Sequence, residues 1–257
     1  MLARACGKFI LAGEHFVVNE ECPAIAYPLK NIFCEIRGSL GDIHICSNIP
    51  IQRGFGSSAA LSVAIVRALK YIHPFSSQES EQERVQKIED FFHGKSSGLD
   101  TTVVWHEKPL YFKNTHDFSF ISSRVSDFVI VDSGPRRNCK EMVEYIQSFR
   151  SGNRQKWLQV VKSMNEIVKH LKTALEEGDW LEVSELINEN HFILKGLELS
   201  TPAIESVIEM ARKEGALAGK VSGAGGGGAV VLLAQKDEAL ILSSQLKKRG
   251  IHVISPS

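Results

Sequence analysis

The sequence has no long hydrophobic run and no excess of charge of either sign. None of its apolar stretches approaches the ~20 residues that a helix needs to cross a bilayer, and the N-terminus lacks the pattern of a signal peptide. Thirty Lys and Arg residues balance thirty Asp and Glu residues, which gives no reason to expect nucleic acid or an anionic membrane as a partner. With 43% hydrophobic and 23% charged residues, the chain has the composition of an ordinary soluble globular protein.

Cysteine is scarce, and its spacing fits neither a disulfide framework nor a metal site. The five cysteines form no CxxC pair; they are Cys6, Cys22, Cys34, Cys46 and Cys139. Reduced thiols are typical of proteins that work in a reducing compartment. We therefore expect a cytoplasmic protein.

The first half of the 257-residue chain reads as short strands separated by turns, and the second half mainly as helices. Strands are predicted at 3–11, 32–37, 43–47, 109–112 and 128–132, and helices at 57–71 and 79–92. After residue 134, helices are predicted at 140–149, 155–177, 179–197 and from Pro202. The chain then reads as a strand, a glycine loop, a strand, a helix and a strand ending near residue 254. The predicted class is α+β with two domains, residues 1–125 and residues 126–257.

Two glycines and two serines precede a helical pattern in the segment GFGSSAA, residues 54–60. Glycine lets backbone amides close around an anion, and a helix start adds oriented N–H groups with partial positive charge. The segment is not a Walker A loop, because the lysine of that motif is missing. It fits a loose GxGxxA pattern, so a dinucleotide-binding turn stays open, as does a simple N-capped helix.

Charged side chains border two other predicted turns. Glu89 ends one helix and Asp100 follows the next turn, so the two carboxylates can face a common point, one to hold a metal and one to handle a proton. A helix cap is the alternative for Asp100. Lys8, Glu14 and His15 surround the turn after the first strand, where buried charges need partners.

Five of the six residues at 223–228 are glycine. This composition would be a costly way to join two strands, because glycine loses more conformational freedom on folding than any other residue. Close approach of the backbone to a ligand or to another loop is the better explanation for this segment.

The order of these motifs resembles that of the GHMP small-molecule kinases. The resemblance is carried by PIQRGFGSSAA at 50–60, SGLD at 97–100 and KVSGAGGGG at 220–228. Within this superfamily, GKFILAGEHFVV at 7–18 and EDFFHGKSSGLD at 89–100 are most similar to mevalonate kinases. The likeness runs from about residue 5 to residue 235.

The resemblance implies an S5-like N-terminal domain, a ferredoxin-like C-terminal domain and an active site in the cleft between them. It implies ATP-dependent phosphorylation of the primary hydroxyl of mevalonate, with Mg²⁺ as the metal. Asp100 and Lys8 would be catalytic, with Asp100 acting either as a base or only to orient the hydroxyl. Glu14 and His15 would bind the substrate.

The same resemblance assigns the phosphates and the metal. Ser58 and Glu89 would hold Mg²⁺. The ATP phosphates would be bound by the residues of one loop: Gly54, Phe55, Gly56, Ser57, Ser58 and Ala59. A second glycine loop, through Gly223, Gly225 and Gly226, would support the first.

Several positions depart from the family pattern, and other functions stay open. Cys6 replaces a proline, and the stretch between Pro28 and Pro50 is shorter than usual, but no charged catalytic group is lost. Phosphomevalonate kinase is the nearest alternative; its first motif tends to carry GEY, which makes His15 the discriminating residue, whereas the basic pair at 136–137 would suit a phosphorylated acceptor. A non-catalytic ligand sensor and an NAD(P)-binding module are further alternatives. The sequence does not fix the oligomeric state, and a homodimer stays open.

Overall fold

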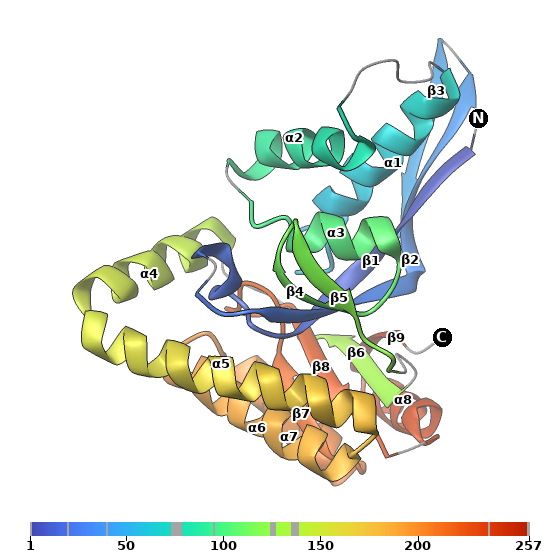
Figure 1. The fold of residues 1–257 in the computed structure, drawn as a ribbon. Coiled ribbons are helices and arrows are strands. Elements are labelled where there is room, and N and C mark those ends of the chain that lie inside the picture. The colour runs from blue at the N-terminus through green and yellow to red at the C-terminus, as the bar shows by residue number, and fades with distance from the viewer. Residues whose placement is uncertain are drawn as a thin grey trace.

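In the computed structural model, the described residues form two antiparallel sheets, one from each half of the chain (Figure 1). The structure describes residues 2–19, 21–39, 41–72, 79–94, 96–123, 127–134, 139–235 and 237–255. The α+β class with two domains is confirmed. The boundary predicted near residue 126 lies outside the described residues, between the last strand of the first sheet and the first strand of the second.

The first sheet has the order β1-β2-β4-β5, and β3 also pairs with β2. Its strands are β1 (Leu2–Ala12), β2 (Ala24–Ser39), β3 (Asp42–Ser47), β4 (Leu110–Asn114) and β5 (Asp117–Phe120). A short 3₁₀ turn, η1 (Val17–Asn19), follows β1. The helices α1 (Ser57–Ile72) and α3 (Leu99–His106) pack on β1 and β2, and α2 (Glu81–His93) packs on both helices.

The second sheet has the order β7-β8-β6-β9. Its strands are β6 (Phe128–Asp132), β7 (Ala218–Val221), β8 (Ala229–Leu233) and β9 (His252–Ser255). The helices of this half are α4 (Cys139–Gly152), α5 (Arg154–Glu177), α6 (Trp180–Gly196), α7 (Pro202–Lys213) and α8 (Ala239–Lys248). Figure 1 shows α5, α6 and α7 stacked below the first sheet.

Local sequence explains where several helices begin and end. Ser80 caps α2 and exchanges hydrogen bonds with Glu83, which is a capping box. Gly94 follows the same helix with a φ of 76°, a conformation that glycine adopts without strain. Thr201 caps α7, whose first residue is proline. These ends lie close to the predicted ones.

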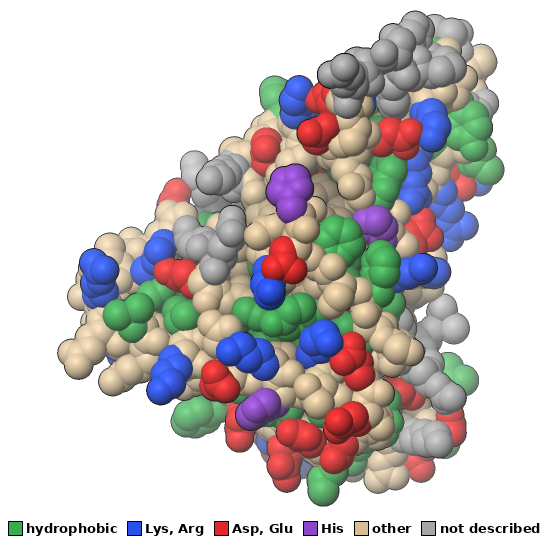
Figure 2. Space-filling view, in the orientation of Figure 1, with side chains coloured by type: hydrophobic (Ala, Val, Ile, Leu, Met, Phe, Trp, Pro, Cys, Tyr) green, Lys and Arg blue, Asp and Glu red, His purple; other side chains and the backbone are tan. Residues whose placement is uncertain are grey.

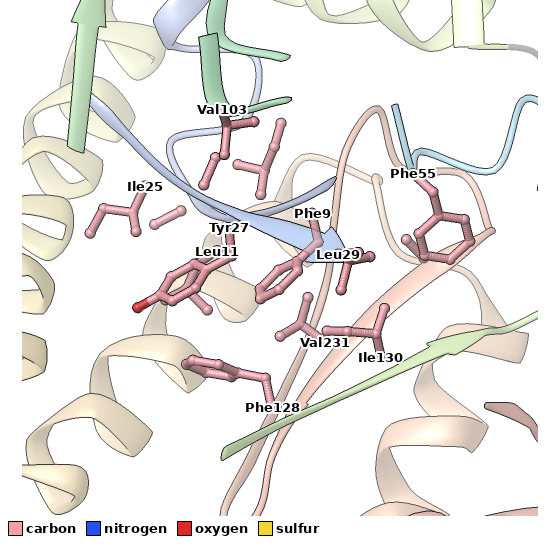
Figure 3. Packing of buried hydrophobic residues seen from close by; sticks show 14 of the residues in the cluster. Phe9, Leu11, Ile25, Tyr27, Leu29, Phe55, Val103, Phe128, Ile130 and Val231 are labelled. Carbon is pink, nitrogen blue, oxygen red and sulfur yellow. The ribbon is translucent and has the colours of Figure 1, made fainter. Parts of the chain in front are cut away.

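An aromatic cluster joins the two sheets (Figure 3). The rings of Phe9 on β1 and Tyr27 on β2 stack with centroids 5.2 Å apart, and Phe128 on β6 packs against both at 5.8 and 5.3 Å. All three side chains are fully buried. The two halves of the chain therefore share one hydrophobic core, which fixes how their loops face each other.

The surface and the cysteines agree with the composition. Acidic and basic side chains are interspersed over most of the face in Figure 2, in keeping with a formal net charge of zero. Cys6, Cys22, Cys34 and Cys46 are free thiols, three of them buried. Within the described ranges, no helix is both long and apolar enough to span a membrane.

Apart from the short 3₁₀ turn η1, three elements were absent from the sequence prediction. These are the first half of β2, the helix α3, of which only a cap was considered, and the strand β5. The other predicted strands and helices are present, with ends shifted by up to three residues.

We expect Phe128→Ala to lower the free energy of unfolding by about 3–5 kcal/mol, because removing a fully buried ring leaves a cavity. Phe192→Ala is the matched control, since Phe192 on α6 is 78% exposed, and it should change stability by less than about 0.5 kcal/mol. Urea denaturation followed by circular dichroism measures both. Equal losses in the two variants would contradict a shared core.

Candidate active site

Lys8 and Asp100 form an ion pair where β1 passes the first turn of α3. The Lys8 Nζ–Asp100 Oδ2 distance is 2.8 Å. Lys8 is only 3% exposed, whereas the side chain of Asp100 is 35% exposed. The ammonium therefore reaches the carboxylate from inside the protein, and the carboxylate stays accessible to a small molecule from outside.

The loop before α1, residues 51–56, lies directly against Lys8. The backbone N–H of Lys8 donates a 2.9 Å hydrogen bond to the carbonyl of Phe55. Gly56 has a φ of +75°, and a Cβ added there would lie 2.7 Å from Cγ of Lys8. Glycine is thus required at position 56 for two reasons. The backbone has a positive φ, and a Cβ would collide with the side chain of Lys8.

The first turn of α1 presents its backbone to the same place. Amides in the first turn of a helix have no acceptor within the helix, and their dipoles favour an anion. The turn begins at Ser57, next to Gly56 and the Lys8 side chain. Gly54 also has a positive φ, of 86°. The first turn of α1 and a buried ammonium therefore lie next to each other, an arrangement that suits a phosphate.

Glu89 links α2 to the start of α1. Its carboxylate is almost fully buried, and its two oxygens accept hydrogen bonds from Ser58 Oγ at 2.8 Å and Ser62 Oγ at 3.0 Å. Ser62 was not predicted, although it stands one helical turn after Ser58. Carboxylate and hydroxyl oxygens are suitable ligands for Mg²⁺.

Few side chains that could ligate a metal ion lie near Glu89 in the described parts of the chain. In the parts of the chain that the structure describes, no three His, Cys, Asp or Glu side chains gather as metal ligands. A cation held by Ser58 and Glu89 would complete its shell with water and phosphate oxygens, as Mg²⁺ usually does in phosphoryl-transfer sites. The residues present fit that mode of binding.

Glu14 and His15 lie in the turn after β1. Glu14 is 1% exposed and forms an ion pair with Lys220, which is 0% exposed. Burial raises the pKa of the Glu14 carboxyl and lowers that of the Lys220 ammonium, while each charge opposes the shift of the other. Glu14 is therefore an internal counterion, and it does not line an open surface.

His15 is held as a neutral side chain. Its Nε2 lies 3.1 Å from the carbonyl oxygen of Ala224, and burial lowers its pKa to about 4. A carbonyl oxygen only accepts hydrogen bonds, so Nε2 carries the proton and Nδ1 is an acceptor. The φ of 62° at His15 is unusual for a residue other than glycine, and the bond to Ala224 helps to hold it.

The glycine loop between β7 and β8, residues 222–228, contacts the loop before α1. A Cβ on Gly223 would lie 3.5 Å from Cα of Gly54, and Ala229 donates a 3.2 Å backbone hydrogen bond to Arg53. Ser222 Oγ donates to the carbonyl of Ile10 at 2.8 Å, which ties the same loop to β1.

The later glycines of this loop face a different neighbour. A Cβ on Gly225 would lie 2.8 Å from the carbonyl oxygen of Leu199, and Gly226 donates a 2.8 Å hydrogen bond to that oxygen. Gly223 therefore lies against the loop before α1, whereas Gly225 and Gly226 lie against the connection between α6 and α7.

Some other predicted residues have buried side chains, and two lie outside the described residues. The side chain of Phe55 is fully buried in the core (Figure 3), so its backbone alone can face a ligand. Ala59 is fully buried as well. The basic pair at 136–137 lies outside the described residues.

Two family models and several known proteins are similar to this chain. The family model described as GHMP kinases N terminal domain matches residues 24–108, and the model GHMP kinases C terminal matches residues 171–252. A mevalonate kinase of Pyrococcus abyssi is 32% identical over 198 residues, which are 75% of this chain and 59% of that relative. A mevalonate kinase of Methanocaldococcus jannaschii is 27% identical over 83% of this chain and 68% of the relative.

Solved structures share the fold. The crystal structure of L. major mevalonate kinase in complex with R-mevalonate superposes with a TM-score of 0.81 at 21% identity, covering 100% of this chain and 96% of that chain. Mevalonate kinase from methicillin-resistant Staphylococcus aureus gives a TM-score of 0.71 at 25% identity, with 98% and 97% covered.

We expect Gly56→Ala to destabilise the protein more than Gly178→Ala. Both glycines have a φ of +75°, but a Cβ at Gly178 meets nothing within 4 Å, so that variant bears only the backbone cost of about 1–2 kcal/mol. Gly56→Ala also displaces Lys8 from Asp100. Urea denaturation measures the difference, and equal losses would show that Lys8 does not depend on Gly56.

Proposed function

This chain belongs to the GHMP kinase family, and on that premise we propose that it transfers the terminal phosphoryl group of ATP to the primary hydroxyl of mevalonate. The observation that carries the proposal is the Lys8–Asp100 ion pair beside the glycine-flanked start of α1. Phosphoryl transfer needs this combination of oriented amides, a fixed cation and a group that handles the proton of the acceptor.

In this proposal the nucleotide phosphates lie at the start of α1. The amides of Gly56, Ser57 and Ser58 hold phosphate oxygens, and the Lys8 ammonium lies beside the terminal phosphoryl group. Ser58 and Glu89 would hold Mg²⁺, which when bound neutralises charge on the phosphates. Gly223 supports the loop from the other side through its contact with Gly54.

The acceptor alcohol approaches Asp100 from the solvent side. The carboxylate takes the hydroxyl proton as the oxygen bonds to the terminal phosphorus of ATP, the bond from that phosphorus to the bridging oxygen breaks and ADP leaves, and Lys8 stabilises the negative charge on the oxygens. Asp100 suits this role because one of its oxygens is anchored by Lys8 at 2.8 Å while the side chain stays partly exposed.

His15 contributes to the substrate side of the site. Its neutral ring offers Nδ1 as an acceptor for a hydroxyl of the substrate, because the bond to Ala224 occupies Nε2. Glu14 contributes as a buried support for this turn. Its Oε2 has no hydrogen-bond partner among the described residues, and its other oxygen is bonded to Lys220.

A coupled assay with mevalonate and phosphomevalonate side by side tests the substrate. We expect turnover of mevalonate, and Asp100→Asn should lower kcat by about 10²–10⁴ with little change in ATP affinity. Asp117→Asn is the control, because Asp117, the first residue of β5, is exposed and pairs with Lys113 of β4. Turnover of phosphomevalonate alone would contradict the proposed acceptor, and near-normal kcat in Asp100→Asn would remove Asp100 from its role.

Glu89→Gln should raise the Mg²⁺ concentration needed for half-maximal activity, because a hard cation loses an anionic oxygen ligand. Glu81→Gln, on the same helix and paired with Lys70, should leave the requirement unchanged. Titration of Mg²⁺ at saturating ATP measures both. If the two variants behave alike, Glu89 is only a structural partner of Ser58 and Ser62.

A further inference from the structure

The turn between β1 and β2 is fastened to the second half of the chain through Glu21. One carboxylate oxygen of Glu21 forms a 2.6 Å ion pair with Arg150 on α4. The other oxygen accepts a 2.9 Å hydrogen bond from Nε1 of Trp157 on α5, and the backbone carbonyl accepts a 2.8 Å bond from Nδ2 of Asn165 on the same helix. Three atoms of one residue therefore hold the turn against α4 and α5.

The ring of Phe16 makes a further contact between this turn and α5. Phe16 stacks on Trp157 with the ring centroids 4.9 Å apart, and both side chains are buried. Trp157 thus meets the turn twice, through its face at Phe16 and through its N–H at Glu21. A buried aromatic ring with a bonded N–H fixes both the distance and the orientation of its neighbours.

These contacts reach His15 through two backbone hydrogen bonds. The N–H of Glu21 donates to the carbonyl of Phe16 at 3.2 Å, and the N–H of Phe16 donates to the carbonyl of Glu14 at 2.7 Å. His15 stands between Glu14 and Phe16, and its positive φ is unfavourable for a residue with a side chain. Such a conformation persists only where the surrounding structure holds it. The fastened turn supplies that support on one side of His15, and the carbonyl of Ala224 supplies it on the other.

The bond to Trp157 gives Glu21 more influence than a surface ion pair has. The side chains of Glu21 and Arg150 are 21% and 39% exposed, and a pair with that exposure contributes little by itself. A buried indole N–H that loses its acceptor, in contrast, keeps the full cost of its removal from water. Replacement of the Glu21 carboxylate should therefore loosen the turn more than the loss of the ion pair alone.

A pocket of about 510 Å³ borders these contacts. Glu21, Arg150 and Trp157 are among the residues that line it. The open space beside the ion pair gives the two charged side chains room to separate. On this side the position of the turn therefore depends on the bonds of Glu21 as well as on packing.

We propose that Glu21 is a positioning residue for the substrate side of the site, which holds the turn that carries His15 by bonding to Arg150 and Trp157. The proposal rests on the proposed kinase activity for its kinetic consequence. In that function His15 binds the acceptor alcohol, whereas the nucleotide phosphates lie at the start of α1. Loss of the Glu21 carboxylate should therefore weaken the binding of mevalonate and leave the binding of ATP unchanged.

Steady-state kinetics with each substrate varied in turn provides the first test. Glu21→Met should raise KM for mevalonate by about 3–30-fold, within the range in which contacting residues are coupled, and keep KM for ATP within about 2-fold of wild type. Glu21→Gln, which keeps an acceptor for Trp157, should give a smaller rise. Glu209→Gln is the control, because Glu209 makes an exposed pair with Lys213 on α7, and it should change neither KM.

A double-mutant cycle separates the contact from a general loss of structure. Trp157→Phe keeps a ring that stacks on Phe16 and removes only the N–H. It should raise KM for mevalonate by less than Glu21→Met does. In the Glu21→Met background the same change should add little, because the acceptor of that N–H is already gone.

Amide hydrogen exchange followed by mass spectrometry provides a readout that needs no turnover. Glu21→Met should speed exchange in peptides that cover residues 13–19 and leave peptides of α1 unchanged, because the opening is local. Glu209→Gln should leave both sets unchanged. If wild-type protein turns over no mevalonate, the proposed function fails, whereas the exchange still decides whether Glu21 holds the turn.

Glu21→Gln and Trp157→Phe carry the test if Glu21→Met does not fold, because both are smaller changes. An unchanged KM for mevalonate, or equal rises in KM for both substrates, would overturn the proposal. So would wild-type exchange at residues 13–19, or effects of Glu21→Met and Trp157→Phe that simply add.

Discussion

The structure depends on one strand that both halves of the chain bury. From Ala5 to Ala12 every residue of β1 is buried. Phe9 packs into the aromatic cluster that joins the two sheets, whereas its neighbour Lys8 reaches Asp100 on α3. Because successive side chains of a strand point to opposite faces, β1 serves as a core element and also carries the Lys8 ammonium, for which we propose a catalytic role. The turn after it adds Glu14, so the candidate site inherits its geometry from the core.

The pairing of β1 with β2 explains a strand that the sequence pattern concealed. Residues 24–31 were not predicted as a strand, and they contain Pro28, which cannot donate to a ladder. In the structure, β4 pairs with 24–26 of β2 and β3 with 34–39, so Pro28 has no partner on that side. On the other side it stands opposite Lys8, next to a register shift between Cys6 and Gly7. An irregularity of this kind redirects a side chain, and here it lies beside the lysine.

The sequence predicted the site residues whose role follows from a local motif. It did not predict contacts between residues that are far apart in the sequence. Gly56 and Asp100 could be found because a glycine beside a helix start and an acid after a turn have a local meaning. Helix α3 could not be found in this way, because its Thr-Thr-Val-Val run has strand propensity. Burial of these residues in the folded protein overrides that propensity. The pairing of Lys220, and the place of Ser62 in the site, could not be predicted, since their partners, Glu14 and Glu89, are distant in sequence.

The charged groups of the candidate site are held in place by the fold before any ligand binds. Lys8 is held by Asp100 and by the narrow passage under Gly56, and Glu89 by two serine hydroxyls. Groups held in this way need little reorganisation when charge develops on a transferring phosphoryl group, and preorganisation of this kind is usually the largest electrostatic contribution to catalysis. A rigid site also has a cost, because each buried ion must keep its counterion. The Glu14–Lys220 pair meets that requirement in the protein interior, where no solvent could screen an unpaired charge.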